Sequence, residues 1–257
     1  MEGSPLPYLS HSRLSSYRQC SLKFRFQYVD KVEPAFVPAP LAFGVAFHQV
    51  VEEALVRLMA GDTPSVEELL PLFATAMDEQ AKEVPVRCGE NETPASMVEL
   101  AERMLKAWLA WQRPAARIIA VEHEFRVPIA EWLPPLVGRI DLVEEHEDHI
   151  EIIDVKTSRG KWGEDDVAQH AGQLSLYRAA IDDLVREVGK PVKLGFEVIT
   201  KTKKPFVERL YVAEVEPLGR QIRTATVVLE AIEKGVFIPS PSWQCASCPF
   251  AEACKAW

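Results

Sequence analysis

The sequence predicts an α/β fold. Stretches in which β-branched residues alternate, above all Val137–Val143 and Ile150–Thr157, are typical of strands, whereas other stretches repeat apolar residues with the period of a helix. At 257 residues, of which 47% are hydrophobic, the chain is long enough to bury a sizeable core. We expect a single domain over residues 1–257, with a helical lobe inserted over residues 62–113.

Composition favours a cytoplasmic protein without a membrane segment. The chain has no apolar run of about 18 residues, and its first residues lack the apolar core of a signal peptide. The cysteines number five, and three of them fall in the last 13 residues. This pattern is unlike a disulfide framework and more like a metal site with one additional thiol.

The net charge of −9 argues against a nucleic-acid partner unless the charge is unevenly distributed. Acidic residues are concentrated in the inserted lobe. Basic residues gather instead in Ser10–Lys31 and in two other short patches, which are Lys156, Arg159 and Lys161, and Lys201, Lys203 and Lys204. Such patches are usually solvated faces, and they bind phosphates only if the fold brings them together.

The first half of the chain is predicted to be mainly helical. In order, we expect a helix over Ser10–Cys20 capped by Ser10 or Ser12, a proline-rich loop over Glu33–Pro40, a helix over Leu41–Ala60 closed by Gly61, and two amphipathic helices over Thr63–Lys82 and Thr93–Arg113. The last two form the acidic lobe. Cys88, between them, has no partner at ligand spacing and is interpreted as an additional thiol.

The helix over Leu41–Ala60 presents one chemically distinctive edge. Gly44, His48 and Glu52 align beside its apolar stripe. A lone histidine in such a place is more often a core residue than a ligand. A ligand role for His48 gains support if this helix packs over the predicted strands.

The second half of the chain supplies the sheet. We expect strands over Ile118–Val127, Val137–Val143 and Ile150–Thr157, a helix near Asp165–Ala180, a hairpin of Val192–Thr200 and Pro205–Val212, and a last helix over Glu216–Lys234 closed by Gly235. The polar run over residues 144–149 separates two of the strands. Glu122 and Glu124 share a strand face, and they either support a metal site or form the polar face of an edge strand.

Asp141 and Asp154 lie near the ends of neighbouring strands, and Lys156 shares a strand face with Asp154. Two carboxylates on buried strands need a common positive partner, and a divalent cation meets that need. The alternative is a surface ion pair between Asp154 and Lys156, worth less than about 1 kcal/mol. On the following helix, Gln173 and Tyr177 are four residues apart and share one face.

The chain ends with a cysteine motif, C-x2-C-x5-C, at Cys245, Cys248 and Cys254. Three thiols leave a tetrahedral set one ligand short, and Cys20 is the natural fourth. Such a site would join the two ends of the chain. Spacing alone favours neither zinc nor an iron–sulfur cluster.

Together these motifs resemble the PD-(D/E)XK nuclease superfamily, in the branch of RecB-type nucleases and CRISPR-associated exonucleases that carry an iron–sulfur cluster. The matching pieces are G-x3-H at Gly44–His48, Asp141, D-x-K at Asp154–Lys156, Q-x3-Y at Gln173–Tyr177, the four cysteines and the opening stretch Leu9–Val32. Two features depart from the pattern. Ser21 stands where this branch often has proline, and the acidic lobe does not align.

The resemblance implies a restriction-endonuclease-like mixed sheet flanked by helices. It also implies that His48, Asp141, Asp154 and the carbonyl of Val155 bind Mg²⁺ or Mn²⁺, that Lys156 orients the attacking water, and that Gln173 and Tyr177 line the site. It implies a [4Fe–4S] cluster on Cys20, Cys245, Cys248 and Cys254, in a module of residue 20 and residues 239–257, with zinc as the alternative. The residues expected to contact DNA are Arg159, Lys161, Lys201, Lys203 and Lys204.

The implied activity is metal-dependent hydrolysis of DNA, as an exonuclease on ends or single strands, in DNA repair, recombination or CRISPR adaptation. One alternative is a catalytically weak nuclease-fold scaffold that binds DNA. Another is a protein whose cysteines bind zinc and whose acidic residues are structural. The chain contains no G-x4-G-K-[ST] motif, so any unwinding would need a helicase partner, and a CRISPR adaptation protein is a further possible partner.

Overall fold

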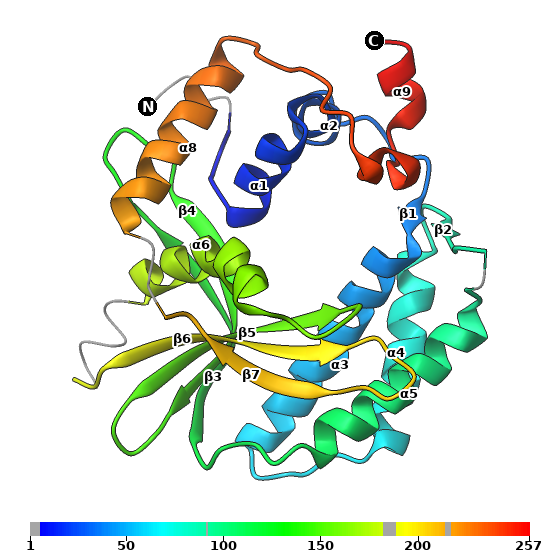
Figure 1. Cartoon of the computed structure of the whole chain (residues 1–257), viewed down its shortest axis with the longest axis vertical. Helices are drawn as coiled ribbons and strands as arrows, with labels where there is room; N and C mark the ends of the chain where they lie inside the picture. Colours follow the sequence, from blue (N-terminus) through cyan, green and yellow to red (C-terminus); the bar gives the residue numbers. More distant parts are fainter. Residues whose placement is uncertain (1–5, 91, 182–188, 214–216) are drawn as a thin grey trace.

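A five-stranded mixed sheet forms the centre of the protein in a computed structural model, which describes residues 6–90, 92–181, 189–213 and 217–257 (Figure 1). The strands are β3 (Arg117–Val127), β4 (Leu136–Glu145), β5 (Ile150–Ser158), β6 (Val192–Thr200) and β7 (Val207–Tyr211), in that spatial order. Only β5 and β6 run parallel; the other neighbouring pairs are antiparallel. The predicted α/β fold with a mixed sheet is confirmed.

One face of the sheet packs against three helices, α3 (Ala39–Met59), α4 (Val66–Gln80) and α5 (Pro94–Ala110). Side chains alternate along β5, so that Ile153 and Val155 join this core while Ile152 joins the core on the other face. Capping boxes at Ser65 and Thr93 begin α4 and α5. The acidic helices therefore share one hydrophobic core with α3 and the sheet.

The other face packs against α1 (His11–Gln19), α6 (Glu164–Ala180) and α8 (Leu218–Glu233). Ser10 caps α1 by accepting a hydrogen bond from the Arg13 backbone, as the sequence predicts. Helix α6 crosses over between the parallel strands β5 and β6. The predicted last helix begins at residue 216, which lies outside the described residues, and α8 ends just before Gly235, whose φ is 68°.

The segment that follows α1 and the C-terminal segment of the chain lie side by side (Figure 1). The N-terminal side provides α2 (Ser21–Phe24) and the π-helix η1 (Arg25–Val29), and the C-terminal side provides η2 (Trp243–Ser247) and α9 (Ala251–Lys255). The Leu22 amide donates to the Ile238 carbonyl at 3.1 Å, and Phe250 packs on Leu22 and Phe26. This junction brings Cys20 close to the C-terminal cysteines.

Two local predictions are wrong. Glu33–Pro40 is not entirely a loop, because Val37–Pro38 forms β1, paired in parallel with β2 (Val86–Arg87), and α3 already begins at Ala39. Pro40 is tolerated there, since the first helical turn needs no backbone N–H from it. The predicted strand Val137–Val143 is also too short, because β4 extends through Glu145, and both Glu144 and His149 of the polar run are buried. In the described residues, no helix is long and apolar enough to cross a membrane.

Candidate functional site

The site begins where β4 and β5 separate. Their ladder ends at the pair Leu142 and Ile153, and beyond it the Val155 amide donates to the Asp141 carboxylate at 2.7 Å. The carboxylate thus takes the place of a strand partner, which holds it against β5. Asp154, only 1% exposed, follows the end of the ladder. The two predicted carboxylates therefore meet at one point of the sheet.

A hydrogen-bond network joins β5 to α6. The Gln173 amide nitrogen donates to Asp154 at 2.7 Å and to the Tyr177 hydroxyl at 2.5 Å, while its oxygen accepts from Lys156 at 3.1 Å. Lys156 also pairs with the other Asp154 oxygen at 2.5 Å. The predicted common face of Gln173 and Tyr177 is confirmed, and it points at the carboxylates. The fold thereby holds Lys156 and Asp154 in one geometry.

The Tyr177 ring is positioned from the sheet side. Phe125 on β3 packs edge to face against it, with ring centroids 5.8 Å apart. Behind Phe125 lies Gly138 on β4, where an added Cβ would come within 2.4 Å of the Phe125 ring. Only glycine allows this approach. Backbone and ring packing thus place the phenol.

His48 on α3 faces the same carboxylates. Its Nδ1 lies 3.8 Å from the Asp141 carboxylate. Helix α3 therefore packs over the strands in the way that a ligand role for His48 requires. The Gly44 position, one turn earlier, leaves space: an added Cβ would meet only the Thr157 hydroxyl, at 3.9 Å.

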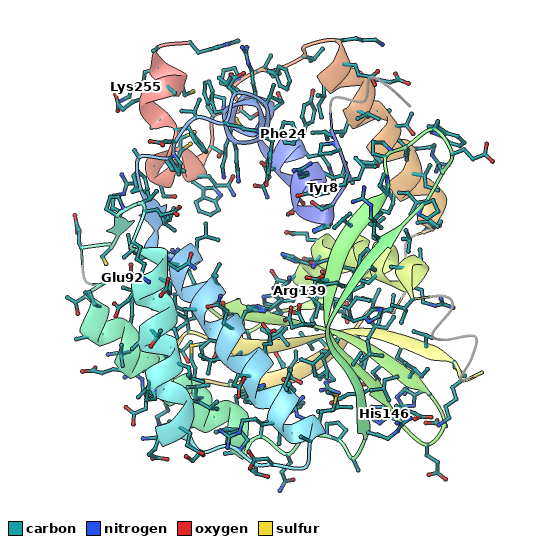
Figure 2. The ribbon with its side chains drawn as sticks, turned by 180° about the vertical axis from the view of Figure 1, so that it is seen from behind. Tyr8, Phe24, Glu92, Arg139, His146 and Lys255 are labelled. Atoms are coloured by element: carbon teal, nitrogen blue, oxygen red, sulfur yellow. The ribbon has the colours of Figure 1, made fainter. Side chains whose placement is uncertain are left out.

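Glu122 on β3 completes this cluster. Ligand atoms of His48, Glu122 and Asp141 all lie within 4.8 Å of one another, whereas Glu124 is exposed. The backbone of Glu122 has a φ of 50°, in the left-handed region, which costs a residue with a side chain about 1–3 kcal/mol. Arg139, near the middle of the molecule in Figure 2, forms an ion pair with it. The sequence left Glu122 and Glu124 as equal candidates, and the strained backbone separates them.

The site carries more negative charge than its own cations balance. Burial raises the pKa of Asp141 well above its ordinary value, and nearby Asp154 raises it further. Burial also raises the pKa of Glu122 to about 7, against the attraction of Arg139. Burial lowers the pKa of Lys156, but the negative charge and hydrogen bond of Asp154 raise it by more, so the Lys156 pKa is raised overall. Burial lowers the pKa of His48, which keeps its imidazole neutral and available as a ligand.

These residues fit a divalent cation. One oxygen of Glu122 and one of Asp154 are buried without a hydrogen-bond partner among the described residues, although each belongs to an ion pair. Carboxylate oxygens with one imidazole suit Mn²⁺ and accept Mg²⁺. A cation at this point would add positive charge beside the buried carboxylates and lower the raised carboxyl pKa values.

The site opens into a cavity of about 520 Å³ that is lined by Asp141, Lys156, Gln173 and Tyr177. His11, the first residue of α1, lines its opposite wall. Burial and, secondarily, Lys156 lower the pKa of His11 to about 4, so that it is neutral near pH 7. Sequence reasoning missed His11, because a residue behind an N-cap serine carries no signal of a contact with strands more than a hundred residues later.

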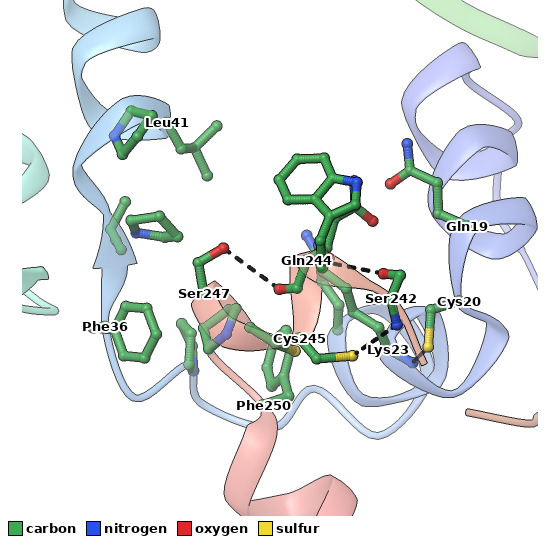
Figure 3. Close-up of a pocket in the computed structure, with 18 of the residues that line it drawn as sticks. Gln19, Cys20, Lys23, Phe36, Leu41, Ser242, Gln244, Cys245, Ser247 and Phe250 are labelled. Carbon is green, nitrogen blue, oxygen red and sulfur yellow. Dashed lines mark hydrogen bonds between the residues drawn. The ribbon is translucent and has the colours of Figure 1, made fainter. Parts of the chain in front are cut away.

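A second cavity, of about 880 Å³, lies between the N-terminal helices, α3 and the cysteine-bearing end of the chain (Figure 3). Arg159 and Lys201 line it, and so does Trp243, whose exposed fraction is 80%. The Lys201 amine reaches the Pro40 carbonyl at 3.4 Å, and burial, with Arg159 nearby, lowers the Lys201 pKa to about 8. Of the residues predicted to contact DNA, Arg159 and Lys201 line this cavity, whereas Lys161, Lys203 and Lys204 do not.

The four predicted cysteines gather beside this cavity. Cys20 and Cys245 lie on the same side of it in Figure 3, and Cys248 and Cys254 pack with Cys20 against Phe250. Burial raises the pKa of Cys254, and the other three thiols raise it further. Among the described residues, no three of these sulfur atoms all lie within 4.8 Å of one another.

Known proteins resemble this chain in sequence or in fold. The family model of the PD-(D/E)XK nuclease superfamily matches residues 8–255. A comparison with curated proteins found no match. Among solved structures, a "putative exonuclease" from Eubacterium rectale is 12% identical with a TM-score of 0.55, covering 97% of this chain and 88% of its own. The structure of SSO0001 is 15% identical, with 95% of each chain covered and a TM-score of 0.41. At 12% identity, the first likeness shows a shared fold.

Proposed function

This chain belongs to the PD-(D/E)XK nuclease superfamily, and we propose that it is a divalent-metal-dependent deoxyribonuclease that acts on DNA ends or single strands. The observation that carries the proposal is the meeting of Asp141, Asp154 and Lys156 where β4 and β5 separate, with Gln173 bridging the last two. A site that had lost its activity would have little reason to keep this buried and mutually dependent set.

The metal would be held by His48, Asp141, Asp154 and the carbonyl of Val155, with Glu122 as an additional carboxylate. When bound, Mg²⁺ or Mn²⁺ supplies a Lewis acid for the scissile phosphate and lowers the pKa of a coordinated water. Glu122 and Asp141 must be ionised to bind the metal, and the positive charge of a cation promotes that ionisation.

Lys156 orients the attacking water and stabilises the charge that develops on the phosphate. Its ammonium group is held between Asp154 and Gln173, so little reorganisation is needed when DNA binds. Burial raises the pKa of Tyr177, which stays protonated and can donate to a phosphate oxygen. His11, neutral and facing the same cavity, can accept or donate one hydrogen bond there.

The DNA strand is proposed to enter through the 880 Å³ cavity. Thr157, next to Lys156 on β5, and Arg159, just after the end of that strand, line this cavity, so it leads toward the metal site. Arg159 and Lys201 can bind the phosphate backbone, and exposed Trp243 offers a ring on which a base can stack. Stacking of this kind requires an unpaired base, which favours a single strand. The proposed phosphate contacts of Lys161, Lys203 and Lys204 would lie outside the cavity.

The four cysteines are proposed to hold a [4Fe–4S] cluster that joins the ends of the chain. The other three thiols act together on the pKa of Cys254, which supports one shared site for all four. Membership of the RecB-type branch, a role in DNA repair, recombination or CRISPR adaptation, and a helicase or CRISPR adaptation partner are proposed from the sequence resemblance.

The test is digestion of end-labelled single- and double-stranded DNA with Mn²⁺ or Mg²⁺. Asp154→Asn should abolish cleavage while DNA binding persists. Glu124→Gln removes a carboxylate from an exposed position outside the cluster and is the matched control. Closed circular single strands should resist an exonuclease. Equal cleavage by wild type and Asp154→Asn would contradict the active-site assignment, and binding by the wild type without cleavage would favour the scaffold alternative.

A further inference from the structure

The turn between β4 and β5 carries a second cluster of potential metal ligands. The His146 amide donates to the His149 carbonyl at 2.8 Å, and Lys190 donates to the His146 carbonyl at 2.7 Å, so the turn is well defined. Figure 2 shows His146 at the end of the sheet, well away from Arg139. Glu151 also lies three residues before Asp154, which places it on the opposite face of β5 and about 10 Å away along the strand.

The ligand atoms converge. His149 Nε2 lies 2.9 Å from one Glu151 oxygen, and His146 Nε2 lies 3.5 Å from the other. Ligand atoms of all three residues lie within 4.8 Å of one another. Because zinc bonds to nitrogen and oxygen are about 2.0–2.2 Å, one ion can reach the three with small side-chain adjustments.

The cluster is buried, and some of its polar atoms have no partner. The His146 side chain is 10% exposed, and its Nε2 accepts and donates no hydrogen bond among the described residues. One oxygen of Glu144, beside it, is likewise without a hydrogen bond. Leaving such groups unsatisfied is costly, since burial removes water without replacing it. A bound ion would take up the free imidazole nitrogen.

The surroundings of the ligands are those of a metal site. Asp148 lies 2.5 Å from His149 Nδ1, the nitrogen that faces away from Glu151. A carboxylate in that place selects the tautomer that leaves Nε2 free for a metal. Tyr211 and Arg209 each donate to Glu151 at 2.9 Å, which holds its carboxylate in one orientation.

The charges favour a divalent ion. Three carboxylates, Glu144, Asp148 and Glu151, lie 2.5–3.9 Å from the imidazoles, and Arg209 pairs with Glu144 and Glu151. Protonated imidazoles could also offset this negative charge. However, the rings of His146 and His149 stack in parallel with centroids 4.4 Å apart, where two positive charges would repel each other.

We propose that His146, His149 and Glu151 form a second metal site, separate from the nuclease centre, that binds a transition-metal ion of the zinc class. Two imidazoles and a carboxylate are the ligands that such an ion prefers, and a fourth position is open to Glu144 or water. The ion would connect the β4–β5 turn to the end of β7 through Tyr211 and Arg209. Its role is structural.

The test is cobalt titration of the full-length protein after treatment with a chelator. Wild type should take up one Co²⁺ with the visible absorption of a tetrahedral nitrogen and oxygen site, without the near-ultraviolet band of a cobalt–thiolate bond that the cysteines would produce. The His146→Gln variant should no longer bind this Co²⁺ ion. His123→Gln, on β3 and outside the cluster, should retain it, and so should Asp141→Asn, which separates the proposal from the nuclease site.

Folding does not confound this test. His146 Nε2 has no hydrogen bond to lose, and Asp148, 82% exposed, gives a milder second variant. Asp148→Asn should keep the site but weaken Zn²⁺ affinity by roughly tenfold or more. An unchanged nitrogen and oxygen spectrum in His146→Gln would overturn the proposal. Absence of that spectrum in wild type, with cobalt bound only to thiolates, would also overturn it and leave the histidines as a site of protonation.

Discussion

Gln173 provides the most direct test of the candidate active site, because it contacts both charged residues of the motif without serving as a proposed metal ligand. In Gln173→Ala, Asp154 loses a hydrogen bond of 2.7 Å and Lys156 one of 3.1 Å. Hydrogen bonds to charged groups contribute about 1.5–3 kcal/mol each, and water entering the cavity will replace part of this. The activation free energy of cleavage should therefore rise by about 3 kcal/mol.

An increase of that size corresponds to a roughly 100-fold lower kcat, since each factor of ten is about 1.4 kcal/mol. KM should change little, because Gln173 is held by protein groups and DNA contacts are assigned elsewhere. The assay is single-turnover cleavage of end-labelled single-stranded DNA in excess Mn²⁺, alongside thermal unfolding. Gln169→Ala, an exposed position one turn earlier on α6, is the matched control and should match wild type.

Two results would refute this reasoning. A kcat within about threefold of wild type would mean that Gln173 does not position Lys156 or Asp154. A loss of activity that only follows a large fall in Tm would mean that the residue supports folding rather than catalysis. A raised KM with unchanged kcat would instead assign Gln173 to DNA binding.

Two further predictions concern charge. Because the pKa of Glu122 is raised from 4.5 to about 7, folding favours its protonated form. The free energy of unfolding of the metal-free protein should therefore fall by up to about 3 kcal/mol as pH rises from 4.5 to 7. Chemical denaturation should show that Glu122→Gln or saturating Mn²⁺ reduces this loss. An equal dependence of the unfolding free energy on pH in wild type and Glu122→Gln would contradict the prediction. In binding to single-stranded DNA, the double variant Arg159→Ala with Lys201→Ala should make the slope of log binding constant against log salt concentration less steep by about 1.4. The double variant Lys203→Ala with Lys204→Ala is the comparison pair. An unchanged slope in the first double variant would mean that DNA does not pass through the cavity.

Local patterns predict much of this fold, because most of its elements follow from short-range periodicity. The longer helices α1, α3, α4, α5, α6 and α8, the five strands of the main sheet and the caps at Ser10 and Gly235 were predictable to within a few residues, whereas α2, η1, η2 and α9 were not predicted. Errors arose where long-range contacts override local signals. Val37–Pro38 is a strand only because Val86–Arg87 lies beside it, and Glu144 is buried only because Arg209, 65 residues later, neutralises it.

The residues that the sequence could assign to the site are those whose spacing has a chemical meaning by itself. The D-x-K alternation, the Gln173–Tyr177 pair and the cysteine spacing all reflect local geometry, and the structure brings each set together. Choosing Glu122 over Glu124 required the left-handed backbone at Glu122 within β3, and finding His11 required the packing of α1 across the sheet.

The sequence by itself determined the chemistry available to this protein, since the kinds and spacing of carboxylate, imidazole, amine and thiol groups follow from the order of residues. Tertiary structure alone decided which of these groups share an environment. It did so because burial and the proximity of other charges set the state of each group. The same residue type is an exposed surface charge at Glu124 and a cluster member with a pKa of about 7 at Glu122.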